Sequence, residues 1–343
     1  MKIRTDGAQG AVACFGEILL RLSTPAHALL SQASKLDMGF GGAEANVAVA
    51  LASLGHETRM LSVLPTGPLG DAALDSLRAR GVDTRRIART EGRLGAYYVV
   101  SGGSLRPSEI VYDRLGSAFA EARGDDYDWA ALLEGASLLH LSGITPALGP
   151  NGAQAALAAA RAARTAGIAV SFDGNYRARL WDRWDGKPRE TLTALVSEAD
   201  IFFGNHRDIA LLLDRPFSGD GEDRRREAAL AAFAAFPNLK RIASTARQVE
   251  QFDAHRIAAR LDTPNEAFQT REVRVSAIVD RIGGGDAFAA GVLHELIRSG
   301  DDSKAVEAGL ALTCLKHSLP GDAALFGQKD LDSFAAGELD VRR

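Results

Sequence analysis

Three consecutive glycines stand directly before an acid in the segment DRIGGGDAFAAG, which runs from Asp280 to Gly291. Gly283, Gly284 and Gly285 have no side chains to pack and are costly to order, so their value lies in the backbone. The residues before them are typical of a strand, and the apolar run after them has the period of a helix. The glycines would then lie at a helix N-terminus, where free N–H groups and the helix dipole favour an anion such as phosphate.

Asp286 follows in the first turn of this predicted helix, beside the expected anion. A carboxylate at this position repels phosphate unless it has another task, and taking the proton of an attacking hydroxyl is such a task. We therefore predict that Asp286 is a general base and that Gly283, Gly284 and Gly285 bind the transferred group. The alternative is a flexible turn in which Asp286 only caps the helix. We expect Gly284 to need either a positive φ or a phosphate approach that a Cβ would block.

The composition excludes several classes of protein. The 343 residues are 46% hydrophobic and 24% charged, with a net charge of -4, so neither nucleic acid nor an anionic membrane is the expected partner. No apolar stretch approaches the roughly 20 residues of a membrane helix. Cys14 and Cys314 lie far apart without metal-ligand spacing, which favours a cytoplasmic location with two reduced thiols. The P-loop motif and the protein-kinase motifs are absent.

Helix-like and strand-like periods alternate along most of the chain, which predicts a mainly parallel sheet in an α/β domain. We expect one continuous strand over 11–23 and a helix from Asn46 to Leu54 that ends at Gly55. Residues 92–118 carry short alternating runs and three of the chain's five tyrosines, a pattern typical of an antiparallel insertion with one exposed face. A second hairpin-rich stretch is expected over 247–279.

The segment GFGGAEANVAVALASLG (39–55) and the segment DRIGGGDAFAAG resemble the two signatures of the ribokinase-type (PfkB) carbohydrate kinase family. DGN (173–175) and FGNHRD (203–208) resemble further family landmarks, and FDGNYRARLW, STARQ and CLKHSLPGD resemble the 2-keto-3-deoxygluconate kinases within it. The resemblance covers nearly the whole chain. It implies a single ribokinase-like domain over 1–343, a three-layer α/β/α fold with a mainly parallel central sheet. A small β-sheet lid would come from about 30–42 and 92–118.

The resemblance also implies a sugar site beneath that lid. The residues implied to bind the sugar, besides Asp286, are Gly42, Asn46, Tyr97, Tyr112, Arg114 and Arg177. The planar fork of Arg177 would pair with a substrate carboxylate. Three alternatives stay open: a helix N-cap for Asn46, lid packing for the tyrosines, and an ordinary surface ion pair for Arg177.

A nucleotide site is implied next to the sugar site. The residues implied to lie along ATP, besides Gly283, Gly284 and Gly285, are Asn175, Asn205, Thr245, Arg247 and Lys316. Asp208 stands where the family usually has a longer Glu, which weakens the case for its contact with Mg²⁺. Asp280, expected at the end of a strand, would either help to hold a monovalent cation such as K⁺ or cap the turn.

The implied activity is transfer of the γ-phosphoryl group of ATP to the 6-hydroxyl of 2-keto-3-deoxygluconate, by a homodimer formed through the lid. Arg177 together with Arg114 favours a sugar acid, because a neutral sugar does not need two cations. The alternatives are a kinase for fructose, ribose or a nucleoside, and a non-catalytic sensor on the same fold. An intact Asp286 argues against the sensor, because a pure binder gains nothing from an acid beside phosphate.

Overall fold

Ten strands form the central sheet of the computed structural model, which describes residues 10–338. Seven neighbouring strands run parallel, as the alternating pattern predicted. In spatial order they are β5 (Ile87–Thr90), β4 (Thr58–Pro65), β1 (Ala11–Phe15), β8 (Ala136–Ser142), β9 (Ala169–Asp173), β10 (Ile201–Phe203) and β11 (Arg241–Gln251). An antiparallel extension follows β11, made of β12 (Ala254–Asp262), β13 (Ala267–Gln269) and β14 (Val273–Ser276).

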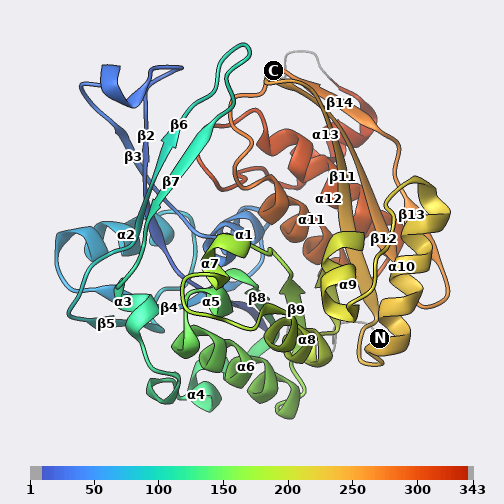
Figure 1. Cartoon of the computed structure of the whole chain (residues 1–343), viewed down its shortest axis with the longest axis horizontal. Coiled ribbons are helices and arrows are strands. Elements are labelled where there is room, and N and C mark those ends of the chain that lie inside the picture. Colours follow the sequence, from blue (N-terminus) through green and yellow to red (C-terminus); the bar gives the residue numbers. More distant parts are fainter. Residues whose placement is uncertain (1–9, 339–343) are drawn as a thin grey trace.

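Helices cover both faces of this sheet and give the predicted three layers (Figure 1). Alternate residues of β1 point to opposite faces: Val12 and Cys14 join one apolar core, while Ala13 and Phe15 join the other. The first core includes α1 (Ala43–Ser53), α2 (Pro68–Arg78), α11 (Gly284–Arg298), α12 (Asp302–Lys316) and α13 (Gln328–Ala336). The second includes α3 (Ala118–Glu121), α4 (Trp129–Leu133), α6 (Pro150–Thr165), α8 (Pro188–Glu198), α9 (His206–Leu213) and α10 (Gly221–Ala235).

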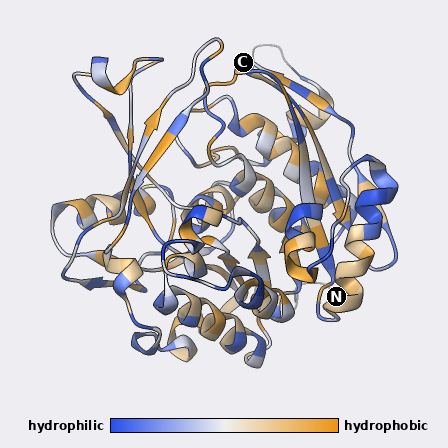
Figure 2. Ribbon diagram, in the orientation of Figure 1, coloured by the Kyte–Doolittle hydropathy of each residue, from blue (hydrophilic) through white to orange (hydrophobic). Residues whose placement is uncertain are grey.

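Four further short helical segments lie between the longer elements. They are η1 (Leu30–Gln32), η2 (Gly124–Asp126), α5 (Ile144–Ala147) and α7 (Ala178–Trp181). Among the longer helices, α10 is hydrophilic over its first turns and apolar further on (Figure 2). Within residues 10–338, no helix combines the length and apolar character needed to cross a bilayer.

A separate four-stranded sheet stands beside the central one, in the order β3 (Asp37–Gly41), β2 (Leu19–Ser23), β6 (Ala96–Val100) and β7 (Glu109–Asp113) (Figure 1). Strands β3, β6 and β7 come from the two segments expected to form a lid. Strand β2 lies outside both segments. The pairing of β6 with β7 is antiparallel, as expected for this stretch.

The single strand predicted over 11–23 is wrong, because the chain changes sheets at Gly16 and Glu17. A Cβ on Gly16 would lie 2.0 Å from Glu44 Oε2, so the backbone packs closely there. The Glu17 side chain is buried in a polar cluster and cannot continue an apolar strand. Strand β1 therefore ends in the central sheet, and β2 begins in the small one.

Two element boundaries, one in segment 39–55 and one just before the glycine run, also differ from expectation. Helix α1 begins at Ala43 with Gly42 as its N-cap, so Asn46 lies inside the helix and the N-cap alternative for Asn46 is wrong. Strand β14 ends at Ser276, so Asp280 lies in the loop before α11 rather than at a strand end. Because this loop is free of sheet pairing, its backbone groups are available to other partners.

Candidate active site

Two adjoining cavities lie at the carboxyl ends of the parallel strands, the edge where open α/β sheets bind ligands. The small-sheet cavity, of about 800 Å³, extends from β9 and β10 to residues of β2, β6 and β7. The β11 cavity, of about 470 Å³, follows β11 and β12. Both are lined by Asn205, Thr245, Arg247, Gly284 and Gly285. Gly42, Asn46, Tyr97, Tyr112, Arg114, Asn175, Arg177, Asp208, Gly283 and Asp286 line the small-sheet cavity alone.

The glycine run forms the N-terminus of α11, as predicted, but its glycines have different roles. Gly283 is the N-cap with φ 79°, and a Cβ there would lie 1.8 Å from the carbonyl oxygen of Asp322. Of the two reasons expected for Gly284, the positive φ is found at Gly283 instead, and the close approach of phosphate stays a prediction. A Cβ on Gly284 would lie 3.2 Å from the ring of His317, whereas one on Gly285 would meet no atom within 4 Å. Gly283 shapes the turn, and Gly285 leaves its outer face open to the cavity.

Asp286 lies in the first turn of α11 and meets the other signature segment at Asn46. The Nδ2 of Asn46 donates a hydrogen bond of 2.7 Å to Asp286 Oδ2. Burial raises the pKa of Asp286 to about 8, the Asn46 hydrogen bond lowers it, and the charges of Asp173 and Asp322 raise it further. A carboxylate with a pKa near neutrality is suited to taking a proton from a hydroxyl. The two signature segments thus meet at one buried, hydrogen-bonded carboxylate.

Two further acids face each other across the floor of the small-sheet cavity. Burial and the nearby Asp208 raise the pKa of Asp173 to about 7, and burial also raises the pKa of Asp208. One oxygen of Asp208 accepts from the N–H of Asn205, 2.8 Å away, while the Asn205 side chain accepts from the N–H of Arg207. Asn205 and Asp208 therefore form a capping box at the start of α9. Although Asp208 is shorter than the Glu usual in the family, its other oxygen, Oδ1, accepts no hydrogen bond from another of the described residues.

Arg114 is buried in an ion pair rather than presented as a spare cation. Its Nε lies 2.8 Å from Glu17 Oε2, and a second guanidinium nitrogen contacts the same oxygen. Ser117 donates to the other oxygen of Glu17. Glu17 neutralises Arg114. The argument that two free cations, Arg114 and Arg177, select a sugar acid therefore no longer applies to Arg114.

Arg177 is one of four arginines that line this cavity without a side-chain hydrogen bond or ion pair to residues 10–338, the others being Arg207, Arg247 and Arg281. It stands at the start of α7, exposed, and its side chain makes no hydrogen bond or ion pair with any residue of 10–338. The surface ion pair considered as its alternative role is therefore not formed within the described chain. Its charge acts on Asp173 and Asp208 across the cavity, where it lowers the pKa of both.

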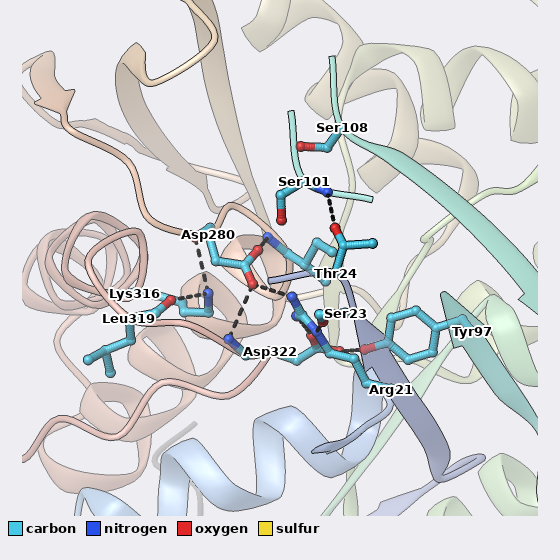
Figure 3. A network of polar contacts seen from close by, with 12 residues as sticks. Arg21, Ser23, Thr24, Tyr97, Ser101, Ser108, Asp280, Lys316, Leu319 and Asp322 are labelled. Atoms are coloured by element: carbon cyan, nitrogen blue, oxygen red, sulfur yellow. Dashed lines mark hydrogen bonds and ion pairs between the residues drawn. The ribbon is translucent and has the colours of Figure 1, made fainter. Parts of the chain in front are cut away.

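A network of buried charges connects the small sheet to the loop before α11 (Figure 3). Arg21 on β2 forms ion pairs with both Asp280 and Asp322. The hydroxyl of Tyr97 on β6 donates to the second oxygen of Asp322. Strands of the small sheet thus bind the two loops that flank the glycine turn. Tyr97 packs in the sheet, but its hydroxyl is buried rather than in solvent, as the lid-packing alternative required. It also lines the cavity, with its ring 5.8 Å from that of the exposed Tyr112.

Lys316 was expected beside the nucleotide, but the structure places it elsewhere. Its side chain is wholly buried, lines neither cavity, and donates to the backbone carbonyls of Asp280 and Leu319. Of the two roles considered for Asp280, the contacts are those of a residue that caps the turn. Its carboxylate accepts from the N–H groups of Ile282 and Gly321 and pairs with Arg21.

Sequence reasoning overlooked Glu17, Arg21, Asp173 and Asp322 as members of the site. The first two had a signal, because they are charged residues that interrupt an apolar run. Asp173 and Asp322 stood inside motifs quoted for the family resemblance, but no local pattern assigned them a contact. Their partners lie far away in sequence, so the fold had to bring them together.

Comparison with known proteins decides the family. A family model described as pfkB family carbohydrate kinase matches residues 9–325. The chain belongs to this family. Ribokinase-like architecture, a separate small sheet and carbohydrate kinase activity are therefore properties of this protein, as the sequence predicted.

Several pfkB family relatives resemble the kinase over almost its full length. A 2-dehydro-3-deoxygalactonokinase of Haloferax volcanii is 32% identical, with 94% of this chain and 96% of the relative aligned. A 2-dehydro-3-deoxygluconokinase of Bacillus subtilis is 28% identical, with 96% of each aligned. The crystal structure of 2-dehydro-3-deoxygluconokinase from Thermotoga maritima superposes with a TM-score of 0.91 at 35% identity, covering 96% of this chain and all of the other.

The raised pKa of Asp286 predicts opposite effects of Asp286→Asn on activity and stability. Removal of a general base should lower kcat ~10²–10⁴-fold while ATP still binds. The substrate-free variant should be more stable than the wild type at pH 8. Folded Asp286 keeps a proton that the unfolded chain releases, so wild-type stability falls as pH rises from the ordinary Asp range towards about 8. Steady-state kinetics and urea unfolding at pH 5 and pH 8 measure both effects. A variant with over half the wild-type kcat would show that Asp286 is not the general base; the alternative of a helix cap is already excluded, because Gly283 is the N-cap.

Gly283→Ala and Gly285→Ala should separate the two uses of the glycine run. Gly283→Ala combines a positive φ with a backbone clash and should lower the free energy of unfolding by about 1–3 kcal/mol or more. Gly285→Ala meets no protein atom and should keep or slightly raise stability, while its methyl group obstructs the cavity and lowers turnover. Denaturant unfolding and kcat compare the pair. Equal stability losses would mean that both glycines serve the fold.

Proposed function

We propose that this kinase transfers the γ-phosphoryl group of ATP to the 6-hydroxyl of 2-keto-3-deoxygluconate. The observation that carries the choice of a sugar acid is the free guanidinium of Arg177, in the same cavity as Asp286. A planar guanidinium is suited to two carboxylate oxygens and offers little to a neutral ketose. The relatives named above support the proposal, because their names specify 2-dehydro-3-deoxy sugar acids as substrates.

In the proposed reaction the sugar occupies the small-sheet cavity, with its carboxylate at Arg177 and its 6-hydroxyl at Asp286. Asp286 takes the hydroxyl proton as the oxygen attacks the γ-phosphorus, and the bond between that phosphorus and the β–γ bridging oxygen breaks to release ADP. Asn46 holds the Asp286 side chain in position through the bond to Oδ2. The N–H groups of Gly285 and Asp286, at the positive end of α11, stabilise the charge that develops on the transferred group, while the N–H of Gly284 donates to the Arg281 carbonyl, 3.3 Å away. Gly42, the N-cap of α1, has no room for a side chain, because a Cβ would lie 2.1 Å from the Glu17 carbonyl oxygen. Glycine at this position lets α1 begin at Ala43 and so places Asn46 beside Asp286.

The nucleotide would occupy the β11 cavity and reach the shared glycine turn. Thr245 and Arg247 on β11 line both cavities and would lie along the phosphates, with Asn205 opposite them. Asn175, beside Asp173, would face the same phosphates from the small-sheet cavity. This division gives each cavity one substrate, with the reacting atoms at the glycines that the two cavities share.

The acids fit a Mg²⁺ ion, which a solved ribokinase-like structure from Escherichia coli holds together with ATP. Burial and the negative charge of Asp208 raise the pKa of Asp173, and a divalent cation relieves that repulsion. Asp173 and Asp208 would hold the ion, directly or through water. When bound, Mg²⁺ neutralises charge on the phosphate oxygens.

The substrate proposal predicts a selective effect of Arg177→Ala. Loss of a charge-assisted pair of roughly 1.5–3 kcal/mol should raise KM for 2-keto-3-deoxygluconate by about ten- to a hundredfold. The effect on kcat should be smaller, because the carboxylate is remote from the 6-hydroxyl. The kcat/KM for fructose, which has no carboxylate, should barely change.

Arg179→Ala is the matched control, because Arg179 is an exposed arginine of the same segment that lines neither cavity. Its KM values should equal those of the wild type. If Arg177→Ala lowered kcat/KM equally for both sugars, the arginine would serve the fold or bind the nucleotide. If the wild type preferred fructose outright, the sugar-acid proposal would be wrong while the kinase activity remained.

A further inference from the structure

A buried ammonium group lies where the sequence suggested a monovalent cation. Lys316 ends α12 with 0% of its surface exposed. Its Nζ lies 3.1 Å from the carbonyl oxygen of Asp280 and 3.3 Å from that of Leu319, and it donates to both (Figure 3). Backbone carbonyls that converge on one point are also the ligands that proteins use for K⁺. The ammonium and an added ion would therefore compete for the same oxygens.

The two loops that Lys316 joins are the walls of the glycine turn. The first loop, 277–283, ends at Gly283, and the second contains Asp322, whose carbonyl would lie 1.8 Å from a Cβ on Gly283. The N–H of Gly321 donates to Asp280 Oδ2 and joins the loops a second time. A movement of either loop would displace the N–H groups at the start of α11. A positive charge between the loops thus fixes the groups that bind the transferred phosphoryl.

The charges around this point balance without an added ion. Asp280 and Asp322 supply two negative charges, and Arg21 and Lys316 supply two positive ones. Both Asp280 oxygens are occupied, Oδ1 by the N–H of Ile282 and Oδ2 by Gly321 and Arg21. Burial lowers the pKa of Lys316, while Asp280 and Asp322 raise it and so favour the charged form. The residues present therefore do not fit a K⁺ ion at Asp280.

We propose that Lys316 is a positioning residue that replaces a monovalent cation, so that phosphoryl transfer by this kinase is independent of K⁺. The ammonium holds the carbonyls of Asp280 and Leu319, and with them the glycine turn. The proposal requires only the kinase activity and is independent of which sugar is phosphorylated.

Salt substitution combined with two variants tests this role. Lys316→Ala removes the ammonium and leaves a space beside the two carbonyls, whereas Lys316→Met fills the same volume without charge or donors. Turnover is measured in KCl, methylammonium chloride and tetramethylammonium chloride at equal ionic strength, with the same sugar throughout. The melting temperature of each substrate-free protein is measured in the same salts and does not depend on activity.

The wild type should have equal turnover in all three salts. Lys316→Ala should lose about ten- to a hundredfold in tetramethylammonium chloride, the range for a hydrogen bond to a charged group, and recover with K⁺ or methylammonium in a saturable manner. Its melting temperature should rise with the same two ions. Lys316→Met should be slow in every salt.

Severalfold activation of the wild type by K⁺ would overturn the proposal, and this measurement does not depend on any variant folding. Full activity of Lys316→Ala in tetramethylammonium chloride would also overturn it. So would a folded Lys316→Ala that neither K⁺ nor methylammonium restores, because Lys316 would then act through packing alone.

Discussion

The site depends on keeping several carboxylates beside the N-terminus of α11, where an anionic substrate must also bind. Asp280, Asp286 and Asp322 lie on or beside the loops around the glycine turn, and like charges this close destabilise one another. Arg21 binds Asp280 and Asp322, and Lys316 fixes the backbone beneath them. Asp286 alone has no cationic partner among the described residues and keeps a raised pKa, which is the property that a general base requires.

Because Arg21 and Tyr97 belong to the small sheet, the position of that sheet and the shape of the glycine turn are coupled. The sheet closes the cavity over Asp286 and supplies the counter-charge for the loops. The same strands place the neutralised Glu17–Arg114 pair at the cavity wall. In the proposed function, selection of an anionic sugar rests on Arg177, which is held on a different loop and remains unpaired within residues 10–338.

The sequence was sufficient to predict the parallel sheet and the helix at the glycine run. It also predicted that the two distant segments 39–55 and 280–291 contribute to one site. These features follow from local period, turn residues and motif order. The end of strand β1 before Gly16 could not be predicted, because it depends on Glu44, which lies in helix α1. Arg114 and Lys316 were misjudged for a similar reason. The sequence reveals the charge of a side chain but not whether that side chain is already paired with a distant group. Here Arg114 is paired with Glu17, and Lys316 donates to the carbonyl of Asp280.

The identity of the sugar is the point on which the proposed function depends most. Purified wild-type enzyme with ATP and Mg²⁺ can be offered 2-keto-3-deoxygluconate, its 4-epimer 2-keto-3-deoxygalactonate, and fructose, with ADP release recorded for each and the phosphorylated carbon identified by NMR. The account predicts phosphorylation at the 6-position, with kcat/KM for 2-keto-3-deoxygluconate at least about tenfold above that for fructose, the minimum for one charge-assisted pair. Preference for the epimer would keep the sugar-acid class and change the substrate. Preference for fructose would contradict the role given to Arg177.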